Sequence, residues 1–447
     1  MCRKFWLLIP ILLTPLQAQQ TADPEKQLLQ EVLRRLDTLE QQNRELLAEV
    51  KELKQAQAQT QTASSAEPPL AEQVKVNETR IAEQAQTKVE SSQKLPVTLY
   101  GALLFNAFSN SKNVTNALGP YSLLTGPGSS GATVRQTILG FDFQGPALPG
   151  GGHVEGTLAT DFWAGPAVPS ANWLRIRRAG ITLDWTNTNV FVGQDKPLIS
   201  PYQPDSLAEV GVPAMSGTGN LWFWLPQVKF EHKLHLGASN GMDAQVAALQ
   251  AGSYLGSGNF SPSPTIYSGG VRPALEARLA FWHKSGETKK FELAPGFHVS
   301  SSHFDGVDLT TKIGSVDWLY TVSPKLEWKG TGYYGQNVAS LGSLGNGFYE
   351  NHRSAVQPVV SAGGWTQLSV PVNNRLTLNV FGGLENDEAG ATSGAGIARS
   401  SSFAGNAMFH LSPNVILSSE AQRLWTRTFS GQPNTYNHYD LALAYLF

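Results

Sequence analysis

The sequence predicts an all-β transmembrane barrel of about sixteen antiparallel strands, preceded by an α-helical coiled coil. Three observations lead to this prediction. The composition changes near residue 96: all 43 glycines lie at or after Gly101, and only Phe5 and Trp6 among the aromatic residues precede Tyr100. Apolar residues follow a heptad period before that point and alternate with polar residues after it. The connections between the alternating segments are long and short in turn, as in outer-membrane barrels.

The overall composition lies between two common classes of protein. Charged residues make up 15% of the chain, whereas about 25% is usual in soluble domains. A mean hydropathy of −0.20 is too low for a bundle of membrane-spanning helices. A barrel whose strands are apolar on one face and polar on the other explains both values. The net charge of −2 offers no basic surface, so we expect no nucleic-acid partner.

Residues 1–18 have the features of a secretory signal peptide. Two basic residues supply the positive end, and an apolar run follows over 5–13. That run is too short for a membrane-spanning helix of about 20 residues, which makes a short membrane anchor the less favoured alternative. Cleavage after Ala18 removes Cys2, the only cysteine, and leaves a chain without disulfides or a thiol nucleophile.

Residues 19–60 are predicted to form the coiled coil. Asp23 and Pro24 are typical of a helix start. Apolar residues then follow in alternating steps of three and four, which is the a and d seam of a heptad repeat. Asn43 occupies an a position, where a buried amide fixes the register of the helices. The seam consists of Leu29, Val32, Leu36, Leu39, Asn43, Leu46, Val50 and Leu53.

The heptads leave two questions open. A single amphipathic helix packed on a domain is the alternative to a coiled coil, although the surrounding residues are too polar to supply a core. The mixture of Leu and Val at a and d does not decide between a dimer and a trimer. Residues 61–96, rich in Gln, Ala, Thr and Ser, are predicted to be a polar linker.

Residues 97–447 are predicted to form the outer-membrane barrel, because their apolar residues alternate with period two. Short turns such as Thr186-Asn187 and Ser412-Pro413 alternate with long connections such as 196–225. Outer-membrane barrels place short turns at the periplasmic end and long loops outside. The expected strands are 97–109, 133–144, 151–163, 172–185, 188–195, 226–236, 242–251, 272–284, 288–300, 306–321, 324–336, 357–371, 374–384, 401–411, 413–427 and 437–447.

The alternation assigns one face of each strand to lipid and the other to the lumen. In 272–284, Leu275 and Phe281 are expected to face lipid, whereas Glu276 and Arg278 face the lumen. Basic and acidic residues are balanced in the lumen under this assignment, which predicts weak ion selectivity. The basic residues assigned to the lumen are Arg178, Lys229, Lys233, Arg278, Lys312 and Lys329.

The last predicted strand ends in an apolar ladder with a terminal aromatic residue. Tyr445 and Phe447 resemble the C-terminal signal that the outer-membrane barrel assembly machinery recognises. That machinery is therefore an expected partner. The ladder consists of Tyr439, Leu441, Leu443, Tyr445 and Phe447.

Motifs of enzymes and metal sites have weaker support. The segment 237–241 matches the pattern of a hydrolase nucleophile around Ser239, but Asn240-Gly241 is a hairpin turn signal between two strands. His232 and His235 lie three residues apart on one strand and point to opposite faces, so they cannot share a metal. We expect no enzymatic activity, no metal and no cofactor.

Four segments carry a resemblance to a known family: 135–142, 174–179, 192–195 and 226–230. In these segments and in layout, the chain resembles trimeric sixteen-stranded outer-membrane porins with a periplasmic coiled-coil extension, the DcaP-like porin group. The resemblance implies a homotrimer, passive diffusion of small polar solutes, and a long third external loop folded into the pore.

The connection over 196–225 corresponds to that third loop. If it folds inward, its acidic residues Asp205 and Glu209 are expected to face Arg178 and Lys229 on the barrel wall. With Lys196, these residues would form the pore constriction, where a transverse field orients dipolar solutes. The alternative is a loop that stays outside as a lid.

The expected function is that of an outer-membrane porin, which allows passive diffusion of small hydrophilic solutes or ions through a water-filled pore. Outer-membrane lipid and lipopolysaccharide would surround the barrel, and the coiled coil would lie in the periplasm. Two other functions remain open. One is an envelope tether or structural barrel with an incidental or plugged pore, and the other, ranked last, is an outer-membrane enzyme with a catalytic cluster in the external loops.

Overall fold

The computed structural model describes residues 97–114, 123–164, 172–251, 272–286, 288–304, 307–344, 346–350, 356–388 and 396–447. The signal peptide over 1–18, the coiled coil over 19–60 with Asn43, and the linker over 61–96 lie outside the described residues. Those three assignments stay predictions. No helix in the described ranges has the length and apolarity needed to cross a membrane.

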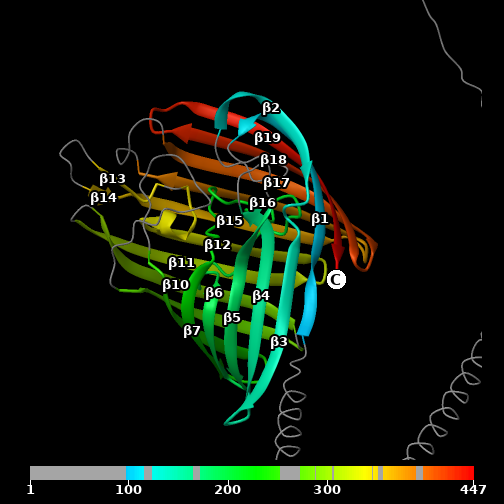
Figure 1. Cartoon of the computed structure of the whole chain (residues 1–447), viewed down its shortest axis with the longest axis vertical. Coiled ribbons are helices and arrows are strands. Elements are labelled where there is room, and N and C mark those ends of the chain that lie inside the picture. The colour runs from blue at the N-terminus through cyan, green and yellow to red at the C-terminus, as the bar shows by residue number, and fades with distance from the viewer. Residues whose placement is uncertain are drawn as a thin grey trace, which may run out of the picture. The chain divides into compact units, whose positions relative to one another are not determined.

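The described part of the chain after residue 96 is dominated by long antiparallel strands (Figure 1). A 3-10 helix, η1 (Val338–Leu341), and a separate pair, β13 (Phe348–Glu350) and β14 (Val356–Pro358), lie in the connection between two of them. The strands of the main sheet are β1 (Val97–Val114), β2 (Leu123–Thr133), β3 (Ile138–Leu148), β4 (Gly152–Ala164), β5 (Trp173–Trp185), β6 (Thr188–Asp195), β7 (Leu225–His235), β8 (Asn240–Leu249), β9 (Ala274–Ser285), β10 (Thr288–Phe304), β11 (Val307–Ser323), β12 (Leu326–Gln336), β15 (Val360–Pro371), β16 (Leu376–Asp387), β17 (Ile397–Ser412), β18 (Val415–Thr428) and β19 (Pro433–Leu446).

The main sheet closes on itself into a barrel. β1 pairs with the last strand, where Phe105 lies opposite Leu443, and on its other edge with β3, where Gly101 lies opposite Leu139. The sheet contains 17 strands, but β2 and β3 both pair with β1 and occupy successive parts of one position. The barrel therefore has sixteen positions, as the sequence predicted. A closed sheet has no free edge that could pair with another chain.

The second position of the barrel differs from the prediction. The sequence analysis expected one strand over 133–144 after a connection over 110–132. In the structure β1 extends to Val114, β2 begins at Leu123, and residues 134–137 leave the ladder between β2 and β3. Period-two alternation cannot reveal this break, because it lies between two segments that both continue as strand.

The two faces of the strands divide as expected. Leu275 of β9 is 53% exposed and faces outward, whereas Glu276 and Arg278 are 2% and 5% exposed and face inward. The C-terminal ladder also faces outward, with Tyr439, Leu441, Leu443 and Tyr445 between 44% and 50% exposed. Such an apolar outer surface suits hydrocarbon rather than water. The terminal Phe447 exchanges two backbone hydrogen bonds with Gly101 of β1 at 3.0 and 3.2 Å.

One assignment to the lumen is wrong. Lys312 of β11 lies opposite Val299 of β10 in the register, and directly paired residues share a face of the sheet. Val299 is exposed on the outer face, while Thr311 and Ile313 on either side of Lys312 are buried. Lys312 therefore belongs to the outer face.

Candidate pore constriction

The connection between β6 and β7, residues 196–224, folds into the barrel. Apolar side chains along it are buried, including Ile199, Ala214 and Leu221. The loop is therefore not an external lid, which was the alternative expectation. Three of the five residues that the sequence analysis assigned to a pore constriction, Lys196, Asp205 and Glu209, lie on this connection.

Residues 198–211, called the inner ring below, follow the wall from β9 round to β5. Each contact joins the ring to the next part of the barrel, so the path is fixed by hydrogen bonds all along its length. The contacts are Leu198 N to Glu276 Oε2 of β9 at 2.6 Å, Tyr202 Oη to Glu292 Oε1 of β10 at 2.8 Å, Asp205 N to Gln367 Oε1 of β15 at 2.7 Å, Ser206 Oγ to Glu420 Oε2 of β18 at 2.7 Å, Asn106 Nδ2 of β1 to Leu207 O at 2.8 Å, Gln136 Nε2 to Ala208 O at 2.6 Å, and Arg175 Nη2 of β5 to Gly211 O at 2.5 Å.

After the inner ring, residues 212–224 cross to the opposite wall before returning to β7. Met215 packs there in a buried cluster with Trp365 of β15. Gly219 has a φ of +107°, and a Cβ at that position would lie 2.2 Å from the carbonyl oxygen of Gly364. Only glycine fits both the backbone conformation and this close approach.

A second connection, between β12 and β15, also enters the barrel. All four residues of η1 are buried. The carbonyl of Leu341 accepts hydrogen bonds from the backbone N–H groups of Trp222 and Phe223 at 3.1 and 3.3 Å. Leu344 N donates to Glu385 Oε1 of β16 at 3.2 Å. The two inward connections therefore support each other inside the lumen.

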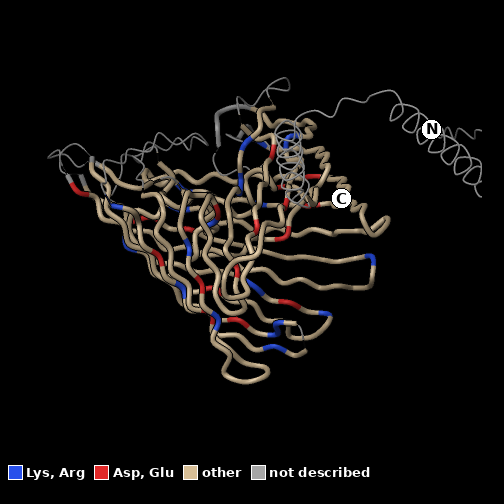
Figure 2. Tube along the Cα trace, turned by 60° about the horizontal axis from the view of Figure 1, so that its bottom comes forward, with Lys and Arg blue, Asp and Glu red and all other residues tan. Residues whose placement is uncertain are grey.

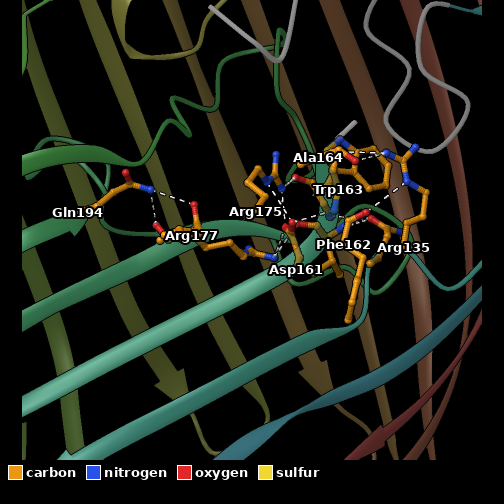
Figure 3. Close-up of polar contacts among 12 residues, drawn as sticks. Arg135, Asp161, Phe162, Trp163, Ala164, Arg175, Arg177 and Gln194 are labelled. Atoms are coloured by element: carbon orange, nitrogen blue, oxygen red, sulfur yellow. Dashed lines mark hydrogen bonds and ion pairs between the residues drawn. The ribbon is translucent and has the colours of Figure 1, made fainter. Parts of the chain in front are cut away.

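A buried carboxylate organises two arginines beside the ring (Figure 3). Asp161 of β4 is fully buried and accepts hydrogen bonds from Arg175 Nε at 3.0 Å and Nη2 at 2.5 Å. Arg177 Nη1 lies 3.5 Å from the same carboxylate and donates to Val210 O at 3.1 Å. The ring of Trp224 lies 4.7 Å from the Arg177 guanidinium carbon, within cation–π distance. Two cations thus share one anion, which leaves a net positive charge at this part of the wall.

A β-bulge explains why neighbouring arginines of β5 all reach the lumen. Arg178 pairs with Ala159, and Ile176 pairs with Thr160, so Arg177 is the extra residue of the strand. An extra residue reverses the alternation beyond it. Ile176 is 51% exposed on the outer face, while the Arg175 and Arg177 side chains are 17% and 12% exposed inside.

The predicted constriction residues fall into separate groups. Arg178 Nε and Lys229 Nζ both approach Asp195 Oδ2, at 3.4 and 3.5 Å. Asp205 instead forms an ion pair with Lys329 Nζ of β12 at 2.7 Å. The expected pairing of Asp205 with Arg178 and Lys229 is therefore wrong, because the ring carries Asp205 past β12 rather than past β5 and β7.

Two further predicted residues have perturbed ionisation. Burial and the nearby positive charge of Arg177 lower the pKa of Lys196 to about 7. Glu209 is 4% exposed, and its pKa is raised well above the ordinary value by burial and by the negative charges of Glu420 and Asp440. Glu209 thus faces acidic residues instead of the expected basic wall.

Charged residues of both signs occur along the barrel strands (Figure 2), and around the inner ring they are unevenly divided. Glu420 of β18 and Asp440 of β19 lie directly opposite each other and are each 5% exposed. Together with Glu209 of the ring, these two carboxylic acids make this side of the wall rich in acidic residues. On the other side, β5 and β7 contribute Arg175, Arg177 and Lys229. The two sides produce a transverse field across the space that the ring surrounds.

Sequence reasoning did not assign Gln136, Asp161, Arg175 or Arg177 to the pore constriction. Alternation assigned Arg178 to the lumen, and the bulge shifts the phase of the alternation so that Arg177 also points inward. Gln136 lies in the break between β2 and β3, which was predicted as continuous strand. Within the described residues, no group of three or more His, Cys, Asp or Glu is placed to hold a metal ion.

A closed barrel of sixteen strands with a long connection folded inside is the architecture of bacterial outer-membrane porins. The fold is similar to that of the outer membrane channel DcaP of Acinetobacter baumannii, at 19% identity over 78% of this chain and 97% of that chain, with a TM-score of 0.64. The resemblance to the DcaP-like group noted in the sequence is thus confirmed in the fold.

Two other solved structures share the architecture. An anion-selective porin from Comamonas acidovorans is 12% identical over 79% of this chain and all of that chain, with a TM-score of 0.55. Salmonella typhi OmpF, in a complex with daunomycin, is 11% identical over 79% of this chain and 98% of that chain, with a TM-score of 0.53. No family model and no curated protein matches the sequence.

Proposed function

We propose that the protein is an outer-membrane porin through which small hydrophilic solutes or ions diffuse passively. The observation that carries the proposal is the inner ring, which runs along the wall of a barrel that is apolar outside and polar inside. Catalysis has no part in this function. The fold shared with an outer membrane channel supports the same conclusion.

The constriction is proposed to lie where the inner ring meets the charged wall. Lys196, Asp205 and Glu209 belong to the connection that carries the ring, and Arg178 and Lys229 belong to the wall beside its start. Because the cations and the acids lie on different sides, the field acts mainly on the orientation of dipolar solutes. The selectivity between anions and cations is accordingly weak.

The remaining parts of the proposal concern the cell and the assembly. The chain is exported by its signal peptide, and its C-terminal residues Tyr445 and Phe447 are recognised by the barrel assembly machinery. Three copies associate in the outer membrane, in contact with lipid and lipopolysaccharide. The coiled coil joins the three copies in the periplasm, with Asn43 fixing its register.

Planar-bilayer recording with the purified full-length protein tests the proposed function. Insertion of a passive channel gives discrete conductance steps, and a salt gradient gives a small reversal potential. An envelope tether with a plugged lumen gives a folded, heat-resistant barrel without steps, which would refute the proposal. A strong anion preference at low salt would refute the weak selectivity.

A further inference from the structure

The break between β2 and β3 has the geometry of a β-bulge. From Thr133 to Ile138 the chain advances five residues, while the partner strand β1 advances four, from Asn106 to Ala102. One extra residue is thus inserted into the barrel wall, as in a β-bulge. Bulges of this kind redirect side chains next to functional sites.

Three consecutive side chains at the break are buried. Arg135, Gln136 and Thr137 are 9%, 0% and 7% exposed, whereas Val134 before them is 54% exposed on the outer face. In a regular strand every second side chain would lie on the exposed outer face, so three successive buried ones depend on the departure from the ladder.

Two of the three side chains close the gap that the break leaves in the wall. Thr137 Oγ1 accepts a hydrogen bond from Leu104 N of β1 at 3.1 Å. The guanidinium of Arg135 donates to the carbonyls of Phe162, Trp163 and Ala164 of β4 at 3.1 to 3.3 Å. These side chains take the place of backbone partners on both neighbouring strands.

The third side chain, that of Gln136, forms hydrogen bonds with the inner ring. Gln136 Oε1 accepts hydrogen bonds from Val210 N at 2.6 Å and Gly211 N at 2.7 Å. Gln136 Nε2 donates to Ala208 O at 2.6 Å and to Asn106 Oδ1 at 3.0 Å. A carboxamide has two donor hydrogens and two acceptor lone pairs, so this fully buried side chain uses its whole capacity.

The hydrogen-bond network of Gln136 continues through Asn106. Its Nδ2 donates to Leu207 O at 2.8 Å and to Asp440 Oδ1 at 3.0 Å. The ring segment 207–211 is thereby joined through two amide side chains to β1 and to the acidic side of the wall.

We propose that Gln136 is a positioning residue that seats segment 207–211 of the inner ring against the wall and so fixes the aperture of the pore. The break between β2 and β3 allows the Gln136 side chain to reach the inner ring. The inference rests on the proposed channel function, because the aperture has a role only if solutes pass through it.

Two variants of Gln136 separate its hydrogen bonds from its volume. Gln136→Met keeps a similar shape and removes every hydrogen bond to the ring. Gln136→Glu keeps the acceptors for Val210 N and Gly211 N and loses the donor to Ala208 O, so it is expected to lie between Gln136→Met and the wild type. Gln422→Met is the matched control, since Gln422 is a buried residue of β18 whose Oε1 has no hydrogen-bond partner among the described residues.

Hydrogen exchange over 207–212, measured by mass spectrometry on the full-length protein in micelles, reports the seating of the ring directly. Three hydrogen bonds join Gln136 to the ring, and each is worth roughly a factor of 5 in an equilibrium constant, so Gln136→Met is expected to exchange there about 100-fold faster. Exchange in Gln422→Met is expected to match the wild type. Equal exchange in Gln136→Met and wild type would overturn the proposal.

Planar-bilayer recordings on the same proteins test the consequence for the aperture. Gln136→Met is expected to fluctuate between several conductance levels, whereas the wild type and Gln422→Met give one steady level. A steady wild-type level in Gln136→Met would overturn the proposal while leaving the channel function intact. If the wild type itself does not conduct, the channel function fails, and the exchange comparison still decides whether Gln136 seats the ring. Should Gln136→Met fail to fold, Gln136→Glu provides the comparison, with an increase in exchange smaller than that of Gln136→Met expected and exchange equal to the wild type overturning the proposal.

Discussion

Replacement of Asp161 by asparagine tests the electrostatic design of the wall beside the ring. Asp161 is fully buried and is the anion shared by Arg175 at 2.5 Å and Arg177 at 3.5 Å. Breaking a buried ion pair by removing one partner costs roughly 3–5 kcal/mol, because a buried charge is left uncompensated. Both arginines keep some exposure and retain carbonyl partners in the ring, at Gly211 and Val210. We therefore expect Asp161→Asn to lower the free energy of unfolding by about 3 kcal/mol, the lower end of that range.

Urea unfolding of the barrel in lipid vesicles, followed by tryptophan fluorescence, measures this loss. The control is Asp308→Asn, since the Asp308 side chain is 79% exposed and pairs with His303 at 2.9 Å. An exposed pair contributes about 0–1 kcal/mol, so the control is expected to stay close to the wild type. A loss in Asp161→Asn no larger than in Asp308→Asn would refute the view that Asp161 neutralises buried cations.

Three further predictions follow from the inner ring and the segments beside it. The cation-to-anion permeability ratio is expected to rise between pH 6 and 8, because Lys196, with a pKa of about 7, is charged below that pH and neutral above it. Reversal potentials measure this ratio, and a pH dependence that survives unchanged in Lys196→Met would contradict the prediction. Gly219→Ala is expected to destabilise the barrel by more than about 1 kcal/mol, because Gly219 has a positive φ and its Cβ position lies against Gly364. Gly332→Ala, with open space around its Cβ position, serves as the unaffected control. Equal urea midpoints for the two variants would contradict a strained backbone at residue 219. Lys329→Gln removes the 2.7 Å ion pair with Asp205 and is expected to shift selectivity toward cations, and an unchanged reversal potential would show that this pair lies outside the path of the ions.

The sequence predicted the barrel but not the arrangement of the residues inside it. Alternation placed Leu275 outside and Glu276 and Arg278 inside, because the lipid and the lumen impose opposite polarity on neighbouring residues. The same alternation failed at Arg177, where one extra residue in β5 reverses the faces. A one-residue bulge keeps the period of two on either side and shifts only its phase, and the run of three arginines does not show which of them is the extra residue.

The path of the inner ring was beyond prediction for a different reason. Its course depends on hydrogen bonds between residues far apart in the chain, such as Asn106 to Leu207 and Asp205 to Gln367. Order and length identified the third connection, and the family resemblance implied that it enters the barrel. They did not predict that Asp205 meets Lys329, or that Glu209 is buried beside Glu420, because those contacts exist only after the barrel has closed.

Conductance with and without the inner ring is the most direct test of the central claim, that the ring limits the pore. Because Asp195 of β6 and Leu225 of β7 lie directly opposite each other, a short Gly-Ser connection can replace residues 196–224, which include the ring, without opening the barrel. The wild type is expected to give discrete steps in planar bilayers, and the ring-deleted barrel larger ones in the same salt. Steps of equal size from two equally folded barrels would contradict the claim.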